Sequence, residues 1–102
     1  MRLVTSELAD IMVVPLPGDL CLLELPGVSQ QLDDVIAAGA RQVVLDLSDT
    51  TLVTAAALRV IDTVEHRLEG LGGSLRLRNP SPLPRKVLEL TGFARLIEPS
   101  ST

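Results

Sequence analysis

A run of apolar residues near the middle of the chain constrains the fold most. Residues 43–47 read Val-Val-Leu-Asp-Leu and are almost continuously apolar. Such a run is typical of a central strand that is covered on both faces. Segments with helical periodicity precede and follow it, and strands separated by helices are joined by crossovers, which make the later strands parallel. We therefore predict an α/β domain with helices packed on a mixed sheet, in the order β-β-α-β-α-β-α.

The first two strands are predicted from short β-rich runs. Residues 11–16 form one run, and Pro15 cannot donate to a strand ladder, so this strand is expected at an edge of the sheet. Residues 17–19 (PGD) are a turn signal, and residues 20–25 form a second run that ends at residues 26–27 (PG). The two runs together predict a hairpin.

Two helices are predicted around the central strand. The first runs over residues 29–38, with Ser29 as its N-cap and Gly39 at its end. The second begins at Thr54 and runs to about residue 69. Its buried stripe recurs at spacings of four, three and four, and consists of Ala57, Ile61, Val64 and Leu68. The residues predicted to lie off that stripe are Arg59, Asp62, Glu65 and His66.

The last third of the chain adds a strand and a helix. Residues 74–78 alternate cleanly, so Leu75 and Leu77 are expected to face the core. Ser81 is predicted to cap a helix that has Pro82 at its first position and ends at Gly92. The inner stripe of this helix is predicted to be Leu83, Val87 and Leu90, and residues 93–97 are predicted to form a short edge strand.

Length and charge narrow the class of protein. The 102 residues make one domain, predicted over residues 11–98 between a loose lead-in (1–10) and a tail (99–102). The net charge is −4 and Phe93 is the single aromatic residue, so nucleic-acid binding is not expected. Residues 1–58 carry two basic and eight acidic groups (net −6), whereas the rest carry seven and five (net +2). Such polarity suits protein docking and is also common in small domains.

The residues offer no catalytic or metal-binding constellation. A single Cys (Cys21) and a single His (His66) cannot build a zinc site or an internal disulfide, and we interpret Cys21 as a small buried hydrophobe. Asp46 and Asp49 are read as strand-end and turn residues rather than Mg²⁺ ligands, and Ser48 as a turn residue. No enzyme activity and no cofactor are therefore expected. The apolar runs are too short to cross a bilayer, so we expect a cytoplasmic protein. The basic residues Arg76, Arg78, Arg85 and Lys86 are interpreted as a solvated rim.

Three stretches resemble the STAS domain of bacterial anti-sigma factor antagonists. They are residues 43–48 (VVLDLS), residues 52–58 (LVTAAAL), and residues 72–82 (GGSLRLRNPSP) followed by 87–93 (VLELTGF). The resemblance covers the chain from about residue 11 onward. It implies a regulatory module that binds an anti-sigma factor, itself a serine kinase, and so releases a sigma factor for transcription.

The chain departs from this family where the switch is located. Family antagonists usually carry Asp-Ser-Ser-Gly at the start of the second helix, and the second serine is phosphorylated. Residues 54–57 here read Thr-Ala-Ala-Ala, so the acceptor position falls on Ala56, which has no hydroxyl. The family's Gly-Glu-Leu-Asp stretch is also changed, since Gly27 is followed by Val28 and Ser29. A phosphate would add about −1.5 to −2 charges at this helix end, and without it the partner-switching cannot work in the usual way.

Several interpretations of this region stay open at the level of sequence. Thr54 is most simply an N-cap, with a displaced phosphoacceptor as the alternative. The three alanines reflect either helix propensity or a flat surface for a partner. The surface implied for partner binding consists of Val28, Ser29, Thr54, Ala55, Ala56, Ala57, Leu58 and Arg59.

Two alternative functions accompany the first. Some small STAS proteins that lack the tandem serines are accessory subunits of ABC-type lipid transporters, but those usually carry a Thr where Ala55 stands here. The other alternative is a scaffold or decoy that binds other STAS proteins in a signalling assembly.

Overall fold

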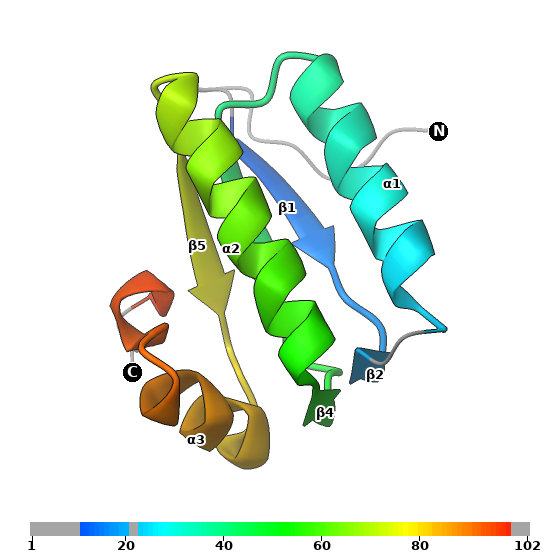
Figure 1. Ribbon diagram of the computed structural model, residues 1–102, viewed down its shortest axis with the longest axis vertical. Coiled ribbons are helices and arrows are strands. Elements are labelled where there is room, and N and C mark those ends of the chain that lie inside the picture. The colour runs from blue at the N-terminus through cyan, green and yellow to red at the C-terminus, as the bar shows by residue number, and fades with distance from the viewer. Residues whose placement is uncertain (1–10, 21–22, 99–102) are drawn as a thin grey trace.

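The structure is a computed structural model that describes residues 11–20 and 23–98 (Figure 1). Its helices are α1 (Leu25–Ala37), α2 (Ala55–Gly70) and α3 (Pro82–Leu90), with a short 3-10 helix η1 (Ala94–Leu96). Its strands are β1 (Ile11–Pro15), β2 (Asp19–Leu20), β3 (Gln42–Asp46), β4 (Leu52–Val53) and β5 (Ser74–Arg78). The predicted order of elements is confirmed, with β4 as an additional short strand.

The strands form two groups in which every described pairing is parallel. The larger sheet has the order β1-β3-β5, so β3 is central and β1 lies at an edge, as predicted. The smaller pairs β2 with β4, in the register Leu20 opposite Val53. The predicted β1–β2 hairpin is wrong, and the strands of residues 11–20 and 23–98 pair in parallel rather than in a mixed arrangement. The reason is the register of β1, which places Val14 in one apolar row with Leu45 and Leu77, whereas β2 is only two residues long.

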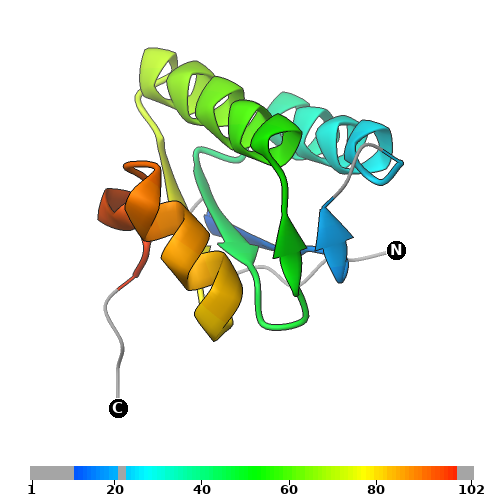
Figure 2. The same ribbon diagram turned by 60° about the horizontal axis from the view of Figure 1, so that its bottom comes forward.

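Two helices cover one face of the larger sheet. Figures 1 and 2 show α1 and α2 side by side on that face, while α3 lies beyond the carboxyl end of β5. There α3 packs against β4 and η1. This arrangement brings the beginning of α2, the beginning of α1 and the two short strands to one end of the molecule (Figure 1).

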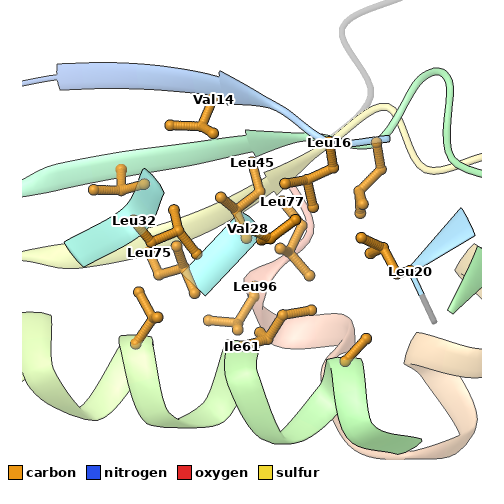
Figure 3. Close-up of a cluster of buried hydrophobic side chains, with 14 of the residues drawn as sticks. Val14, Leu16, Leu20, Val28, Leu32, Leu45, Ile61, Leu75, Leu77 and Leu96 are labelled. Atoms are coloured by element: carbon orange, nitrogen blue, oxygen red, sulfur yellow. The ribbon is translucent and has the colours of Figure 1, made fainter. Parts of the chain in front are cut away.

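The core between these layers is aliphatic (Figure 3). The predicted inward positions Leu75 and Leu77 are 2% and 0% exposed. The predicted stripe of α2 is also confirmed, since all four of its residues are buried. Burial of each such aliphatic side chain contributes about 1.5–3 kcal/mol relative to its exposure.

The start of α1 differs from the prediction. The helix begins at Leu25, with Glu24 at the N-cap position, so Ser29 lies inside the helix and does not cap it. Pro26 occupies the first turn, where its missing N–H costs little. The buried residues Leu25, Val28 and Leu32 recur at helical spacing and extend the apolar face toward the N-terminus. Of the predicted strand over residues 20–25, Leu20 belongs to β2, residues 23–24 form a turn and Leu25 begins the helix, while Cys21 lies outside the described residues.

The third helix presents a different face from the one predicted. Ser81 is its N-cap residue but makes no side-chain capping bond. Pro84 and Leu88 are the buried residues, whereas Leu83 and Leu90 are 63% and 76% exposed. The predicted inner stripe is therefore wrong. Leu83 precedes the buried Pro84 by one residue, and a shift of one residue turns a helix by about 100°. The face that carries Leu83 and Leu90 therefore differs from the face that carries Pro84 and Leu88.

The C-terminal segment also differs from the predicted edge strand. Residues 94–96 form η1, and a single parallel bridge pairs Ile97 with Leu77. The backbone N–H of Glu98 donates to the carbonyl of Leu77 at 2.8 Å. The segment therefore pairs with β5 through a single bridge, beside an ion pair between Glu98 and Arg78, and does not extend the sheet as a strand.

A close backbone approach fixes the end of α2 against the start of β3. Gly72 has φ +82, and a Cβ on the next residue, Gly73, would lie 1.9 Å from the carbonyl oxygen of Arg41. The N–H of Ser74 donates to that same oxygen at 2.8 Å. Glycine is thus favoured at these two positions for different reasons. Gly72 has a left-handed backbone conformation, and at Gly73 the contact with Arg41 leaves no room for a Cβ.

Candidate protein-binding site

The first turn of α2 stands at the end of the molecule where β2 and β4 lie (Figure 1). Strand β4 leads directly into Thr54, the N-cap residue of α2. Its backbone is extended, with φ −96 and ψ 169, and its hydroxyl accepts the N–H of Ala57 at 3.3 Å. The predicted N-cap role of Thr54 is confirmed.

The same hydroxyl makes a second bond that the sequence does not reveal. Thr54 Oγ1 donates to the carbonyl of Leu20 in β2 at 2.8 Å. The hydroxyl proton is therefore used by the backbone of β2, while a lone pair is used by the helix. The bond ties the start of α2 to the neighbouring strand and places the hydroxyl in a structural role.

A threonine in the preceding loop adds a further tie. Thr50 is fully buried, and its hydroxyl donates to the carbonyl of Pro17 at 2.9 Å. The N–H groups of Thr51 and Leu52 both donate to the carbonyl of Gly18, at 2.7 and 3.2 Å. The loop before β2 and the loop before β4 are thus held together. No sequence pattern singled out Thr50, because its partner lies 33 residues away.

The three alanines occupy different environments. Ala55 is exposed, Ala56 is half-buried, and Ala57 is 1% exposed and belongs to the core. Leu58 is half-buried against the core, and Arg59 is exposed. The surface of this turn is therefore small and flat, with an apolar side chain and a cation at its far side.

The residues predicted on α1 divide between the core and the surface. Val28 is 7% exposed and packs in the core, whereas Ser29 is half-buried. Ser29 and Arg59 line one groove between α1 and α2, with a volume of about 320 Å³. The other residues that line it are Asp33, Val60, Thr63, Val64 and Arg67. The structure thus brings Ser29 and Arg59 together, as predicted for a shared surface, and an ion pair between Asp33 and Arg67 joins the two helices.

One charged residue of α2 contradicts its predicted place on the outer face. Glu65 is 4% exposed, and both oxygens of its carboxylate accept from the guanidinium of Arg95, one of them at 2.9 Å. The Arg95 hydrogen bonds lower the pKa of Glu65, against the opposing effect of burial. Sequence periodicity missed this pair because Arg95 stands 30 residues away, in η1.

The remaining candidates have structural roles. Asp46 Oδ1 accepts the N–H of Ser48 at 3.0 Å, in the predicted turn. His66 is exposed on α2, as predicted, and its ring nitrogen contacts the backbone carbonyl of Asp62 at 2.8 Å. Within residues 11–20 and 23–98, no cluster of three or more His, Cys, Asp or Glu residues could hold a metal ion. None of the described helices is both long and apolar enough to span a membrane.

Comparison with known proteins places the chain in a family. The STAS domain profile matches residues 2–102. A Bordetella bronchiseptica protein, BtrV, provisionally named an anti-sigma factor antagonist, is 29% identical over 93 residues, which cover 91% of this chain and 80% of BtrV.

Solved structures show the same fold. The anti-sigma factor antagonist SpoIIAA in its unphosphorylated form superposes with a TM-score of 0.79 at 21% identity, over 89% of this chain and 80% of SpoIIAA. An anti-sigma factor antagonist from Mycobacterium paratuberculosis gives the same TM-score and identity, over 90% of this chain and 80% of that one. The chain therefore belongs to the STAS domain family, and its fold is that of the anti-sigma factor antagonists.

Proposed function

We propose that this chain is an anti-sigma factor antagonist that binds a serine-kinase-type anti-sigma factor through the first turn of α2. Such binding would release a sigma factor for transcription. The observation that carries the proposal is the state of that turn. Its one hydroxyl, on Thr54, donates to the Leu20 carbonyl and accepts the Ala57 N–H, and Ala55 and Ala56 offer only methyl groups to a partner.

The proposed contact surface is drawn from the exposed and half-buried residues. Ala55, Ala56, Leu58 and Arg59 face outward to differing degrees, and Ser29 shares a groove with Arg59. Ala57 and Val28 are core residues and act by holding the two helices in place. Small side chains let a partner backbone approach the helix closely, and Arg59 supplies a cation at the edge of the contact.

The proposal also holds that this chain lacks the phosphorylation switch that the family resemblance implies at the start of α2. Ala56 has no oxygen to accept a phosphoryl group, and the Thr54 hydroxyl is held between the Leu20 carbonyl and the Ala57 amide. Phosphorylation of Thr54 would replace the hydroxyl proton and so break the bond to the Leu20 carbonyl. We therefore propose that the chain binds its partner constitutively, without control by phosphorylation at this turn.

The test is the affinity for the anti-sigma factor, measured by isothermal titration calorimetry with two matched variants. Ala55→Glu places a carboxylate on the proposed surface, and Ala37→Glu places one on an exposed alanine in the last turn of α1. An acidic group in the first turn of a helix is stabilising, by about 0.3–1 kcal/mol, so the first variant will stay folded.

We expect Ala55→Glu to weaken binding at least about 30-fold, or ~2 kcal/mol, and Ala37→Glu to leave it unchanged. Equal affinity of all three proteins would place the partner elsewhere. No binding by the wild-type chain, together with recovery of a transporter ATPase or only of other STAS proteins from cells, would favour the alternative functions.

A further inference from the structure

The groove between α1 and α2 continues from the proposed contact surface along the two helices, which lie side by side (Figure 1). Ser29 and Asp33 line it from α1, four residues apart and therefore on one face of that helix. Arg59 lines it from α2 and lies one turn beyond Ala55. The groove has a volume of about 320 Å³, which is within the range of roughly 300–1,000 Å³ for ligand pockets. It is therefore large enough to receive a side chain of a partner.

One positive charge in this groove has no counterion among the described residues. Asp33 and Arg67 form an ion pair between its two walls. Arg59 is exposed and makes no ion pair with any residue of 11–20 or 23–98. Of the described residues that line the groove, two arginines and one aspartate are charged, so the groove is positive overall in a chain of net charge −4. The groove thus attracts an anionic group to Arg59.

The uncharged residues that line the groove suit an acidic side chain. Val60 is half-buried and Val64 is 4% exposed, so together they offer an apolar floor for methylene groups. Ser29 and Thr63 add hydroxyls, which can donate to a carboxylate oxygen. The guanidinium of Arg59 can donate two parallel hydrogen bonds to the same group. A carboxylate on a short aliphatic stem therefore matches the groove in charge and in hydrogen bonding.

We propose that the groove receives an Asp or Glu side chain of the anti-sigma factor, at its end between Arg59 and Ser29. The inference rests on the proposed function and names the chemical group that the partner presents there. A single carboxylate neutralises the charge of Arg59. A dianionic phosphoryl group would exceed that charge and would meet the carboxylate of Asp33 in the same groove, whereas a basic side chain would be repelled by Arg59.

The position of this site explains what the small residues before it contribute. The Cβ atoms of a helix tilt toward its N-terminus, so the side chain of Arg59 extends toward the first turn of α2. Ala55 and Ala56 in that turn carry only methyl groups and leave the approach to the groove open. A partner backbone that passes over the two alanines can thus direct its carboxylate to Arg59, while Asp33 keeps Arg67 occupied.

Isothermal titration calorimetry of the full chain against a serine-kinase-type anti-sigma factor tests the inference. Arg59→Gln removes the unpaired charge, and we expect it to weaken binding about tenfold. Asp33→Asn frees Arg67 and adds one positive charge to the groove, so it should tighten binding about threefold. Arg76→Gln is the matched control and should leave the affinity unchanged, because Arg76 is an exposed arginine of β5 that makes no ion pair with any described residue.

Ionic strength provides a second readout. Salt screens the pair between Arg59 and the partner carboxylate, so the affinity of the wild-type chain should fall between about 50 mM and about 300 mM salt. Arg59→Gln should show a weaker fall over the same range, because it no longer carries the charge that the salt screens. Circular dichroism melts establish that the variants are folded.

The outcomes separate this inference from the proposed function. If Ala55→Glu weakens binding but Arg59→Gln does not, the inference is overturned and the proposed function stands. Weaker or unchanged binding by Asp33→Asn also overturns the inference, because the affinity would then not follow the charge of the groove. Absence of binding by the wild-type chain overturns both.

Discussion

The hydroxyl of Thr54 donates to the carbonyl of Leu20 at 2.8 Å, which joins the start of α2 to β2. The same oxygen accepts the Ala57 N–H, so one side chain caps the helix and connects two elements that are 34 residues apart. This bond decides which chemistry remains at the turn. The residues that follow Thr54 on the surface, Ala55 and Ala56, carry only methyl groups.

Replacing Thr54 should destabilise the fold. Thr54→Val keeps the shape but removes the cap and the bond to Leu20, and we expect a loss of about 2 kcal/mol in the free energy of unfolding. Thr54→Ser retains the hydroxyl and should lose less than half of that. Urea denaturation followed by circular dichroism measures both. Equal losses in the two variants would show that the hydroxyl is not what matters.

Restoring a hydroxyl at position 56 should restore phosphorylation if the kinase still recognises this loop. We expect Ala56→Ser to gain one phosphoryl group from ATP when incubated with the anti-sigma factor kinase, and to bind it less tightly afterwards, because the added charge of about −2 stands on the interface. Intact mass spectrometry detects the group, and the wild-type chain is the control. Tight binding without phosphoryl transfer would contradict the view that only the acceptor is missing.

Filling the space at Gly73 should be costly. The Cβ of Gly73→Ala would meet the Arg41 carbonyl at 1.9 Å, which forces the α2–β5 connection away from the start of β3. We expect a loss of about 3 kcal/mol. Gly70→Ala is the matched control, since nothing lies within 4 Å of its Cβ, and a helical Gly-to-Ala change is stabilising by about 0.5–1 kcal/mol. Thermal unfolding of the two variants should shift in opposite directions.

The Glu65–Arg95 pair should make stability depend on pH at the acidic end. Because the pKa of Glu65 is lowered below its ordinary value of 4.5, the unfolded chain binds the proton more readily. Its contribution is therefore fully present above pH 4.5 and is lost as the pH falls through the lowered pKa. We expect Glu65→Gln to lose about 2 kcal/mol at pH 7, and this deficit to shrink on acidification.

Urea unfolding between pH 7 and pH 3 measures the contribution of the Glu65–Arg95 pair. Glu89→Gln is the control, because it removes an ordinary surface ion pair, which is worth about 0.5 kcal/mol or less. A deficit of Glu65→Gln that stays constant down to the acid limit would mean that the pKa of Glu65 is not lowered in the folded chain.

Local signals in the sequence predicted much of the architecture. The continuous run in β3, the alternation in β5 and the four-residue stripe of α2 each report burial directly, and all three were confirmed. The cap at Thr54 followed from the same kind of local rule. These features need only neighbours within one or two helical turns, or one strand.

The failures have a common physical origin in partners that are distant along the chain. Pairing of β1 with β3 rather than β2, burial of Glu65 against Arg95, and the bond from Thr50 to Pro17 each join residues about 30 positions apart. The face of α3 was predicted one residue out of phase, because two apolar stripes compete on that helix and only the surrounding fold selects between them. The binding surface at α2 rests on the family resemblance and stays a proposal.

The most direct test of the central claim is to map the bound partner on the chain itself. Isotope-labelled protein would be titrated with the anti-sigma factor, and amide signals followed by NMR. We predict that the largest changes fall on residues 55–59 and Ser29, and that the mass of the chain stays unchanged when ATP and Mg²⁺ are added. Changes confined to α3 or the outer face of the sheet, or a phosphoryl group on Thr54, would contradict the account.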